Sequence, residues 1–148
     1  MGIQALLDYC DEMEIDMNQK QQELFNSYLD MFGKRAFAHI ATLMPDGSPQ
    51  VSPVWVDFDG KHVLVNTARG RQKDRNVSRD PRVALAIQDP QDPYRKLLLR
   101  GRVVDIITKG AEEHIDRLAV KYTGQTYAWR TEGMVREILK VEIQHVAG

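Results

Sequence analysis

The sequence predicts a mainly β fold with flanking helices. About six apolar segments have the length of strands, and tight turns rich in Asp, Gly and Pro separate several of them. Strands that follow one another through tight turns form an antiparallel sheet. A chain of 148 residues suits one such sheet closed into a small barrel.

The chain is expected to begin with helices. Residues 3–14 place apolar side chains at helical spacing. A second helix is predicted from Asn18, a suitable N-cap, to Gly33, a suitable C-terminal stop. We therefore divide the chain into an N-terminal helical extension, residues 1–34, and a barrel domain, residues 35–148.

From residue 35 onward, the apolar residues follow the period of strands, with two helices between them. Asp46-Gly47 and Asp59-Gly60 provide the positive φ that a hairpin turn requires, and Gly101 marks a bend or bulge in a long strand. The predicted strands are 37–44, 50–58, 62–67, 83–87, 97–107 and 135–146. The predicted helices are 71–79 and 110–122, and the predicted irregular segments are 89–93 and 123–134.

Composition excludes several classes of protein. Lys and Arg total 20 and Asp and Glu total 21, so a net charge of −1 argues against broad, salt-dependent nucleic-acid binding. The single cysteine cannot form an internal disulfide, which favours the reducing cytoplasm. No apolar run reaches the roughly 18–20 residues that span a bilayer, and no basic signal peptide begins the chain. A cytoplasmic protein without membrane or nucleic-acid partners is expected.

The sequence lacks the common catalytic and metal-binding motifs. Its four histidines are far apart and none lies beside a second ligand at metal spacing, so no metal site is predicted. Cys10 lies in an acidic segment, which disfavours a thiolate. No nucleophile elbow, Walker loop or GxGxxG is present. The sequence therefore identifies no catalytic residue.

The clearest chemical signal is a basic segment at a boundary between strand and helix. Residues 69–82 contain six basic residues and two acidic ones. A glycine-containing loop leads into the predicted helix, whose first N–H groups and positive dipole end favour an anion. Arg71 and Lys73 would add charge-assisted hydrogen bonds. The segment predicts a phosphate site, with an ordinary basic surface turn as the alternative.

Several short motifs occur in the order of a known family. They are Phe37–Leu43, Asp46–Trp55, Asn66–Asn76, Arg79–Leu85, Asp89-Pro90 with Tyr94, and Leu99–Val103. Taken together, they resemble the pyridoxamine-phosphate-oxidase-like split-barrel flavoproteins over residues 36–146. The resemblance is strongest to the deazaflavin-dependent branch, whose members use coenzyme F420.

The resemblance implies a six-stranded antiparallel split β-barrel of the FMN-binding type. It also implies a homodimer with two cofactor sites at the subunit interface. The cofactor-binding residues that it implies are Gln50, Val51, Ser52, Pro53, Val54, Asn66, Thr67, Arg71, Gln72, Lys73, Asn76 and Trp129. Lys73 would contact the cofactor phosphate, and residues 50–54 would line the ring system. Trp129 would cover the cofactor from the other protomer or serve as an interface anchor.

One departure from the family pattern bears on the cofactor. Ser52 stands where the oxidase branch carries an arginine for the FMN phosphate, which favours coenzyme F420. The implied function is an F420-dependent oxidoreductase that transfers a hydride to an unsaturated or heteroaromatic small molecule. Solvent, Tyr94 or Tyr127 would supply the proton.

Three alternatives to this function stay open. An FMN-binding oxidase or flavin reductase is the first, and a non-catalytic carrier or sensor of flavin or deazaflavin is the second. A nucleic-acid-binding barrel ranks last, because residues 69–82 contain no aromatic side chain on which a base could stack.

Overall fold

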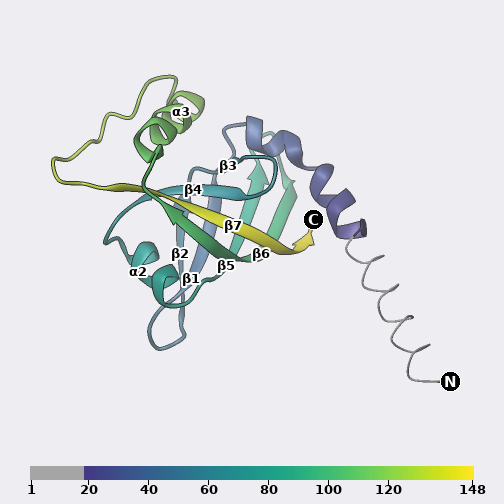
Figure 1. Ribbon diagram of the computed structural model, residues 1–148. Coiled ribbons are helices and arrows are strands. Elements are labelled where there is room, and N and C mark those ends of the chain that lie inside the picture. Colours follow the sequence, from purple (N-terminus) through teal and green to yellow (C-terminus); the bar gives the residue numbers. More distant parts are fainter. Residues whose placement is uncertain (1–18) are drawn as a thin grey trace.

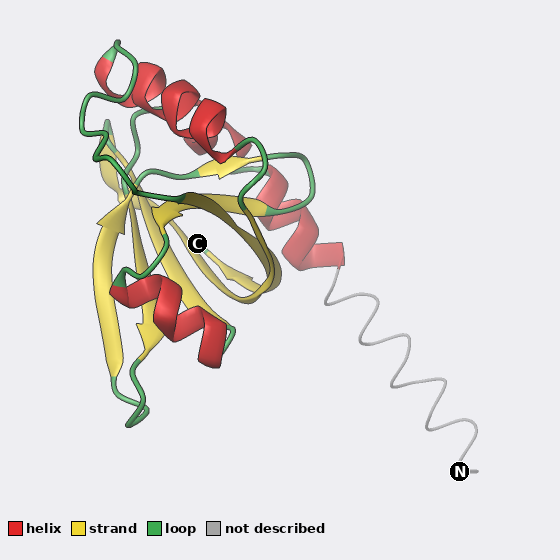
Figure 2. Ribbon diagram, turned by 60° about the vertical axis from the view of Figure 1, so that its left-hand side comes forward, coloured by secondary structure: helices red, strands yellow, loops and turns green. Residues whose placement is uncertain are grey.

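The computed structural model describes residues 19–148, which contain one curled antiparallel sheet (Figure 1). The strand order is β2-β1-β5-β6-β7-β4-β3, and every neighbouring pair is antiparallel. The strands are β1 (Ala38–Leu43), β2 (Pro49–Val54), β3 (Asp57–Phe58), β4 (Val63–Ala68), β5 (Arg82–Asp89), β6 (Asp92–Ile107) and β7 (Arg136–Ala147). Helices α2 (Gln72–Arg79) and α3 (Ala111–Thr123) flank the sheet (Figure 2). The mainly β fold predicted from the sequence is confirmed.

The predicted second strand, 50–58, is divided in two, so the sheet has seven strands where six were predicted. Trp55 and Val56 leave the sheet between β2 and β3, and groups outside the sheet satisfy the backbone of Val56. The Val56 N–H donates to Tyr122 Oη, and the Val56 carbonyl accepts a hydrogen bond from Lys121 Nζ at 2.6 Å. Both partners belong to α3, which therefore interrupts the strand.

The hairpin between β5 and β6 is tighter than the predicted loop 89–93. Asp89 pairs directly with Asp92, so only two residues remain in the turn and Pro93 lies within β6. The bulge predicted at Gly101 is confirmed, because the β6–β7 register shifts between Arg100 and Gly101. These two features give β6 its length of 16 residues and let it follow the curl of the sheet.

Alternate residues of the strands fill the inside of the curled sheet, as expected when successive side chains point to opposite faces. The largest members of this core include Ile40, Ile87, Leu97, Leu99 and Leu139. A second, smaller cluster lies beneath α3 and contains Ile115, Leu118 and Tyr122. This smaller cluster forms one wall of the cavity described below.

The described part of the N-terminal extension packs into the main core. It is helical over residues 19–26 and continues, after a turn, as the 3-10 helix η1 (Leu29–Gly33). The single helix predicted over 18–33 is therefore wrong, although the break lets Phe25 and Phe32 both pack on Phe58. Asn18 and the predicted helix 3–14 lie outside the described residues.

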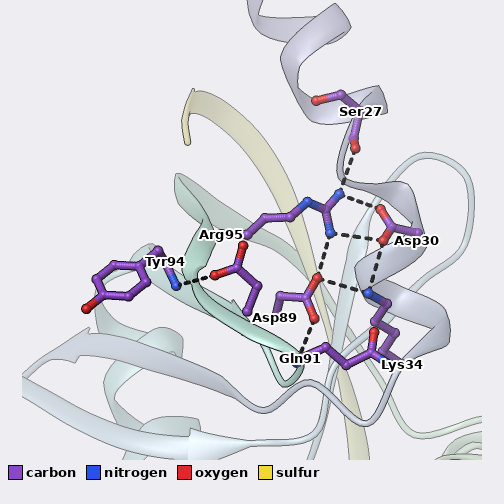
Figure 3. A network of polar contacts seen from close by, with 8 residues as sticks. Ser27, Asp30, Lys34, Asp89, Gln91, Tyr94 and Arg95 are labelled. Carbon is purple, nitrogen blue, oxygen red and sulfur yellow. Dashed lines mark hydrogen bonds and ion pairs between the residues drawn. The ribbon is translucent and has the colours of Figure 1, made fainter.

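A polar network fastens this segment to the β5–β6 hairpin (Figure 3). Arg95 donates to both oxygens of Asp30, to the Ser27 carbonyl and to Asp89. Lys34 donates to Asp89 Oδ2 at 2.9 Å. The Gln91 N–H bond, followed by the bond from Lys34, lowers the pKa of Asp89 to about 2. Asp89 is thus an ionised, largely buried carboxylate between two cations.

Candidate functional site

A cavity of about 210 Å³ opens where α3, the β2–β3 connection and the start of α2 meet. We call it the cationic cavity. Its lining residues are Phe37, Pro53, Val54, Trp55, Asn66, Arg71, Lys73, Ile115, Leu118, Tyr127, Trp129 and Arg136. Three of these side chains are cationic, and none of the described residues that line the cavity is acidic.

The cations come from the start of α2 and the start of β7. Arg71 is the N-cap residue of α2, and Lys73 lies in the first helical turn. Burial is the main cause that lowers the pKa of Lys73, and the positive charges of Arg71 and Arg136 lower it further. A negatively charged group in the cavity would offset this repulsion, and the helix dipole would add to its attraction. The arrangement suits an anion.

Arg136 is the site residue that sequence reasoning missed. Its side chain is almost fully buried, and its Nε–H donates to Asn66 Oδ1 at 2.9 Å. Its guanidinium lies 5.1 Å from the centre of the Tyr127 ring. The only signal in the sequence is a charged pair, Arg136-Glu137, at the start of a strand that is otherwise rich in apolar residues. Nothing in that pattern indicates a partner on β4.

Aromatic side chains form the other walls. Trp55 stacks on Tyr122 with ring centres 5.3 Å apart and an interplanar angle of 6°. Tyr127 meets the rings of Trp55 and Trp129 edge to face. Phe37 and Trp129 lie at the surface, 51% and 63% exposed. Flat apolar walls beside a group of cations suit a planar ligand that carries an anionic substituent.

The structure brings together half of the predicted site residues. Those that line the cationic cavity are Pro53, Val54, Asn66, Arg71, Lys73 and Trp129. Gln50, Val51 and Ser52 lie further along β2 and do not line it. Gln72 is turned along α2, where its Nε2 donates to Asn76 Oδ1.

Thr67 and Asn76 differ most from the expected arrangement, because both are completely buried. Thr67 lies on the core face of β4, opposite to the face that carries Asn66. Asn76 points toward β1 and donates to Thr42 Oγ1 at 2.9 Å. In this conformation neither side chain reaches the cationic cavity.

A second, larger hollow of about 560 Å³ lies on the outer face of the sheet. We call it the sheet-face hollow. Directly opposed residues form one row across it: Val51, Ala41, Ala84, Arg100 and His145. A parallel row contains Pro53, His39, Ala86, Leu98 and Ala147. Pro53 lines the cationic cavity and is paired with His39, which lines the hollow, so the two depressions lie next to each other at β2.

Residues 19–148 contain neither a candidate metal site nor a candidate membrane-spanning helix. No group of three or more His, Cys, Asp or Glu side chains in this range could hold a metal ion. Within the same range, no helix combines the length and apolar composition needed to cross a membrane.

Comparison with known proteins identifies the family. The family described as pyridoxamine 5'-phosphate oxidase matches residues 24–148. A solved structure titled F420 reductase is 31% identical, covers 80% of this chain and 94% of its own, and superposes with a TM-score of 0.72. A conserved hypothetical protein from Mycobacterium tuberculosis is 22% identical, with a TM-score of 0.61, covering 79% of this chain and 78% of its own.

A third structure shows the same fold at lower identity. It is a putative pyridoxamine 5'-phosphate oxidase from Lactobacillus delbrueckii, 18% identical, which covers 87% of this chain and 91% of its own with a TM-score of 0.53. The match to the family extends over most of the chain, and the curled antiparallel sheet described above is the split barrel of that family. The chain belongs to the pyridoxamine 5'-phosphate oxidase family.

Proposed function

We propose that this protein is an oxidoreductase that binds the deazaflavin coenzyme F420 in the cationic cavity and transfers a hydride to an unsaturated or heteroaromatic small molecule. The observation that carries the proposal is the lining of the cavity, which joins three cations and no acid to a wall of aromatic rings. The 31% identity to a structure titled F420 reductase supports the choice of cofactor. Ser52, where the oxidase branch carries an arginine, supports it further.

The residues of this chain would bind and orient the cofactor. Lys73, Arg71 and Arg136 would hold its anionic part, and the apolar surface of Val54 and Trp55 would hold its ring system. When bound in reduced form, the deazaflavin supplies the hydride, so the protein needs no metal or nucleophile for that step. Of the two tyrosines considered as proton donors, Tyr127 lines the cavity, whereas Tyr94 is 89% exposed on the β5–β6 hairpin.

We also propose that the protein is a homodimer and that the second copy completes the site. A cavity of about 210 Å³ is small beside the roughly 300–1,000 Å³ of most ligand pockets. The exposed rings of Phe37 and Trp129 at its rim would gain a cover. The sheet-face hollow offers a broad face, mostly of small and apolar residues, next to the cavity: His39 in the hollow is paired with Pro53 in the cavity. A second copy on this face would lie beside the cofactor.

Fluorescence titration of the purified protein with F420 and with FMN tests the cofactor. We expect saturable F420 binding and weaker FMN binding. Failure of both ligands to bind a folded protein would overturn the assignment. Tight FMN binding without F420 binding would replace the proposal by an FMN-dependent oxidase or flavin reductase.

A second measurement separates an enzyme from a carrier. Reduced F420 is mixed with the protein and a panel of unsaturated and heteroaromatic acceptors, and its oxidation is followed by absorbance. We expect turnover with at least one acceptor, and little when Lys73→Glu replaces the wild type. Stoichiometric binding without any turnover would indicate a carrier or sensor.

A further inference from the structure

A chain of hydrogen bonds runs from the cationic cavity into the protein behind it. Arg136 donates to Asn66 Oδ1, and Asn66 Nδ2 lies 3.1 Å from His114 Nδ1. His114 Nε2 in turn lies 3.1 Å from Asp57 Oδ2. His114 belongs to α3, is 1% exposed and does not line the cavity, so it would act only through Asn66.

The partners of Asn66 determine the protonation of the histidine. Arginine only donates, so the Asn66 oxygen must face Arg136. The Asn66 amide nitrogen donates to the Ala111 carbonyl at 2.9 Å, which fixes the same orientation from the other side. Nδ1 of His114 therefore faces an N–H donor and must accept. This hydrogen-bond pattern fits the neutral tautomer, in which the ring proton lies on Nε2 and is donated to Asp57.

We propose that neutral His114 is a positioning residue for Arg136, and that protonation of His114 releases Arg136 and weakens the binding of an anionic cofactor. This rests on the proposed function, which places the anionic part of the cofactor in the cationic cavity. A proton on Nδ1 would point at the amide protons of Asn66. If Asn66 turned its oxygen toward the ring, its amide group would face the donors of Arg136 instead.

Charged groups from three elements surround His114. The Asp57 carboxylate lies on β3, and Lys121, on the same helix as His114, acts on Asp57. Arg136 lies on β7 beyond Asn66, and Glu112 acts on Arg136 from the first turn of α3. Burial by itself raises the pKa of Asp57, but the bonds from His114 and the Phe58 N–H outweigh it and lower the pKa. Asp57 therefore stays ionised over the range in which imidazole groups titrate.

Nuclear magnetic resonance of the ligand-free protein tests the positioning directly and needs no variant. We expect the His114 ring in the Nε2–H form and a protected Arg136 Nε–H signal at about pH 7.5, the signal losing its protection at about pH 5.5. A His114 proton on Nδ1, or an Arg136 signal unchanged by acid, would overturn the proposal whether or not a cofactor binds.

Binding of FMN and of F420 at both pH values adds a functional readout. His114→Ala should lose affinity, and His114→Gln should restore it, because a glutamine can accept from Asn66 and donate to Asp57 without titrating. Acidification should raise the Kd of the wild type at least about fivefold more than it raises the Kd of His114→Gln. Both proteins bind the same ligand, so titration of the ligand itself affects both equally. His62→Gln, outside the cavity lining, should behave as the wild type.

The outcomes separate the two proposals. Equal acid sensitivity of the wild type and His114→Gln would refute the positioning role while leaving the cofactor assignment intact. If neither ligand binds the wild type at about pH 7.5, the proposed function fails, and the Arg136 signal alone decides whether His114 positions it.

Discussion

Lys73 in the first turn of α2 and Arg136 at the first position of β7 line the same cavity. Burial and the neighbouring charges of Arg71 and Arg136 lower the pKa of Lys73. The described lining offers no carboxylate to compensate these charges. Cations held together in this way make the free protein less stable and the complex with an anion more favourable.

The first prediction concerns Lys73. If it contacts the anionic part of the cofactor, Lys73→Ala should weaken binding by about 1.5–3 kcal/mol, the range for a hydrogen bond to a charged group. This corresponds to roughly a ten- to hundredfold higher Kd, measured by fluorescence titration. Lys61→Ala, exposed in the turn between β3 and β4, is the matched control and should bind as the wild type. An unchanged affinity of Lys73→Ala would place the anion elsewhere.

Much of the fold could be predicted because the strands are local patterns. Alternating apolar residues and Asp-Gly turns locate β1, β4, β5 and β7 within a few residues. The break at Trp55 and Val56 was not predictable, because it depends on Tyr122 and Lys121 from a helix far along the chain. A local pattern carries no information on such a partner.

The candidate site, like the fold, could be predicted only where its residues belong to one local segment. The basic loop and the start of α2 predicted Arg71 and Lys73, since both residues belong to one short segment. Asn76 follows Lys73 by one helical turn, yet it faces β1 and binds Thr42. Helical spacing gives the angle between two side chains but not what each one meets. Arg136 required the β4–β7 pairing, which brings it to Asn66.

A second prediction concerns Gly101, where the backbone of β7 leaves no room for a side chain on β6. A Cβ at this position would overlap the carbonyl oxygen of Glu142, which belongs to the backbone and cannot move aside as a flexible side chain would. Gly101→Ala should therefore destabilise the protein by about 3 kcal/mol, measured by urea unfolding. Gly33→Ala is the control, because a Cβ there would meet nothing within 4 Å. Equal stability of both variants would contradict the close approach of the two strands.

A third prediction follows from the network around Asp89. Its pKa is lowered from 3.8 to about 2 by the Gln91 N–H and then by Lys34 and Arg95. Because the pKa of Asp89 is lower in the folded protein than in the unfolded chain, the ionised carboxylate stabilises the fold. This stabilisation is complete above the pKa of the unfolded chain and is lost as the pH falls from 3.8 toward 2. Asp89→Asn should lower the thermal stability at neutral pH and flatten its decline in that acid range.

Asp92→Asn, at the exposed start of β6, is the matched control for this network. It should keep the wild-type decline in acid, because Asp92 accepts a bond only from the Tyr94 N–H among the contacts of the described hairpin. Calorimetry between neutral pH and the acid range measures both variants. A decline that persists unchanged in Asp89→Asn would assign the acid sensitivity to other carboxylates.

The last prediction concerns the sheet-face hollow and the proposed dimer. Leu98 lies in the row that leads to Pro53 and is 38% exposed in the single chain. Leu98→Glu would bury an unpaired carboxylate between two copies, at a cost of about 3–5 kcal/mol to association. Light scattering coupled to gel filtration should find a dimeric wild type and a monomeric variant. Val120→Glu, an exposed apolar position on α3, should remain dimeric. In the monomeric variant Phe37 and Trp129 would lose their cover, so its affinity for F420 should be lower than that of the wild type. A monomeric wild type that binds F420 fully would show that one copy is sufficient.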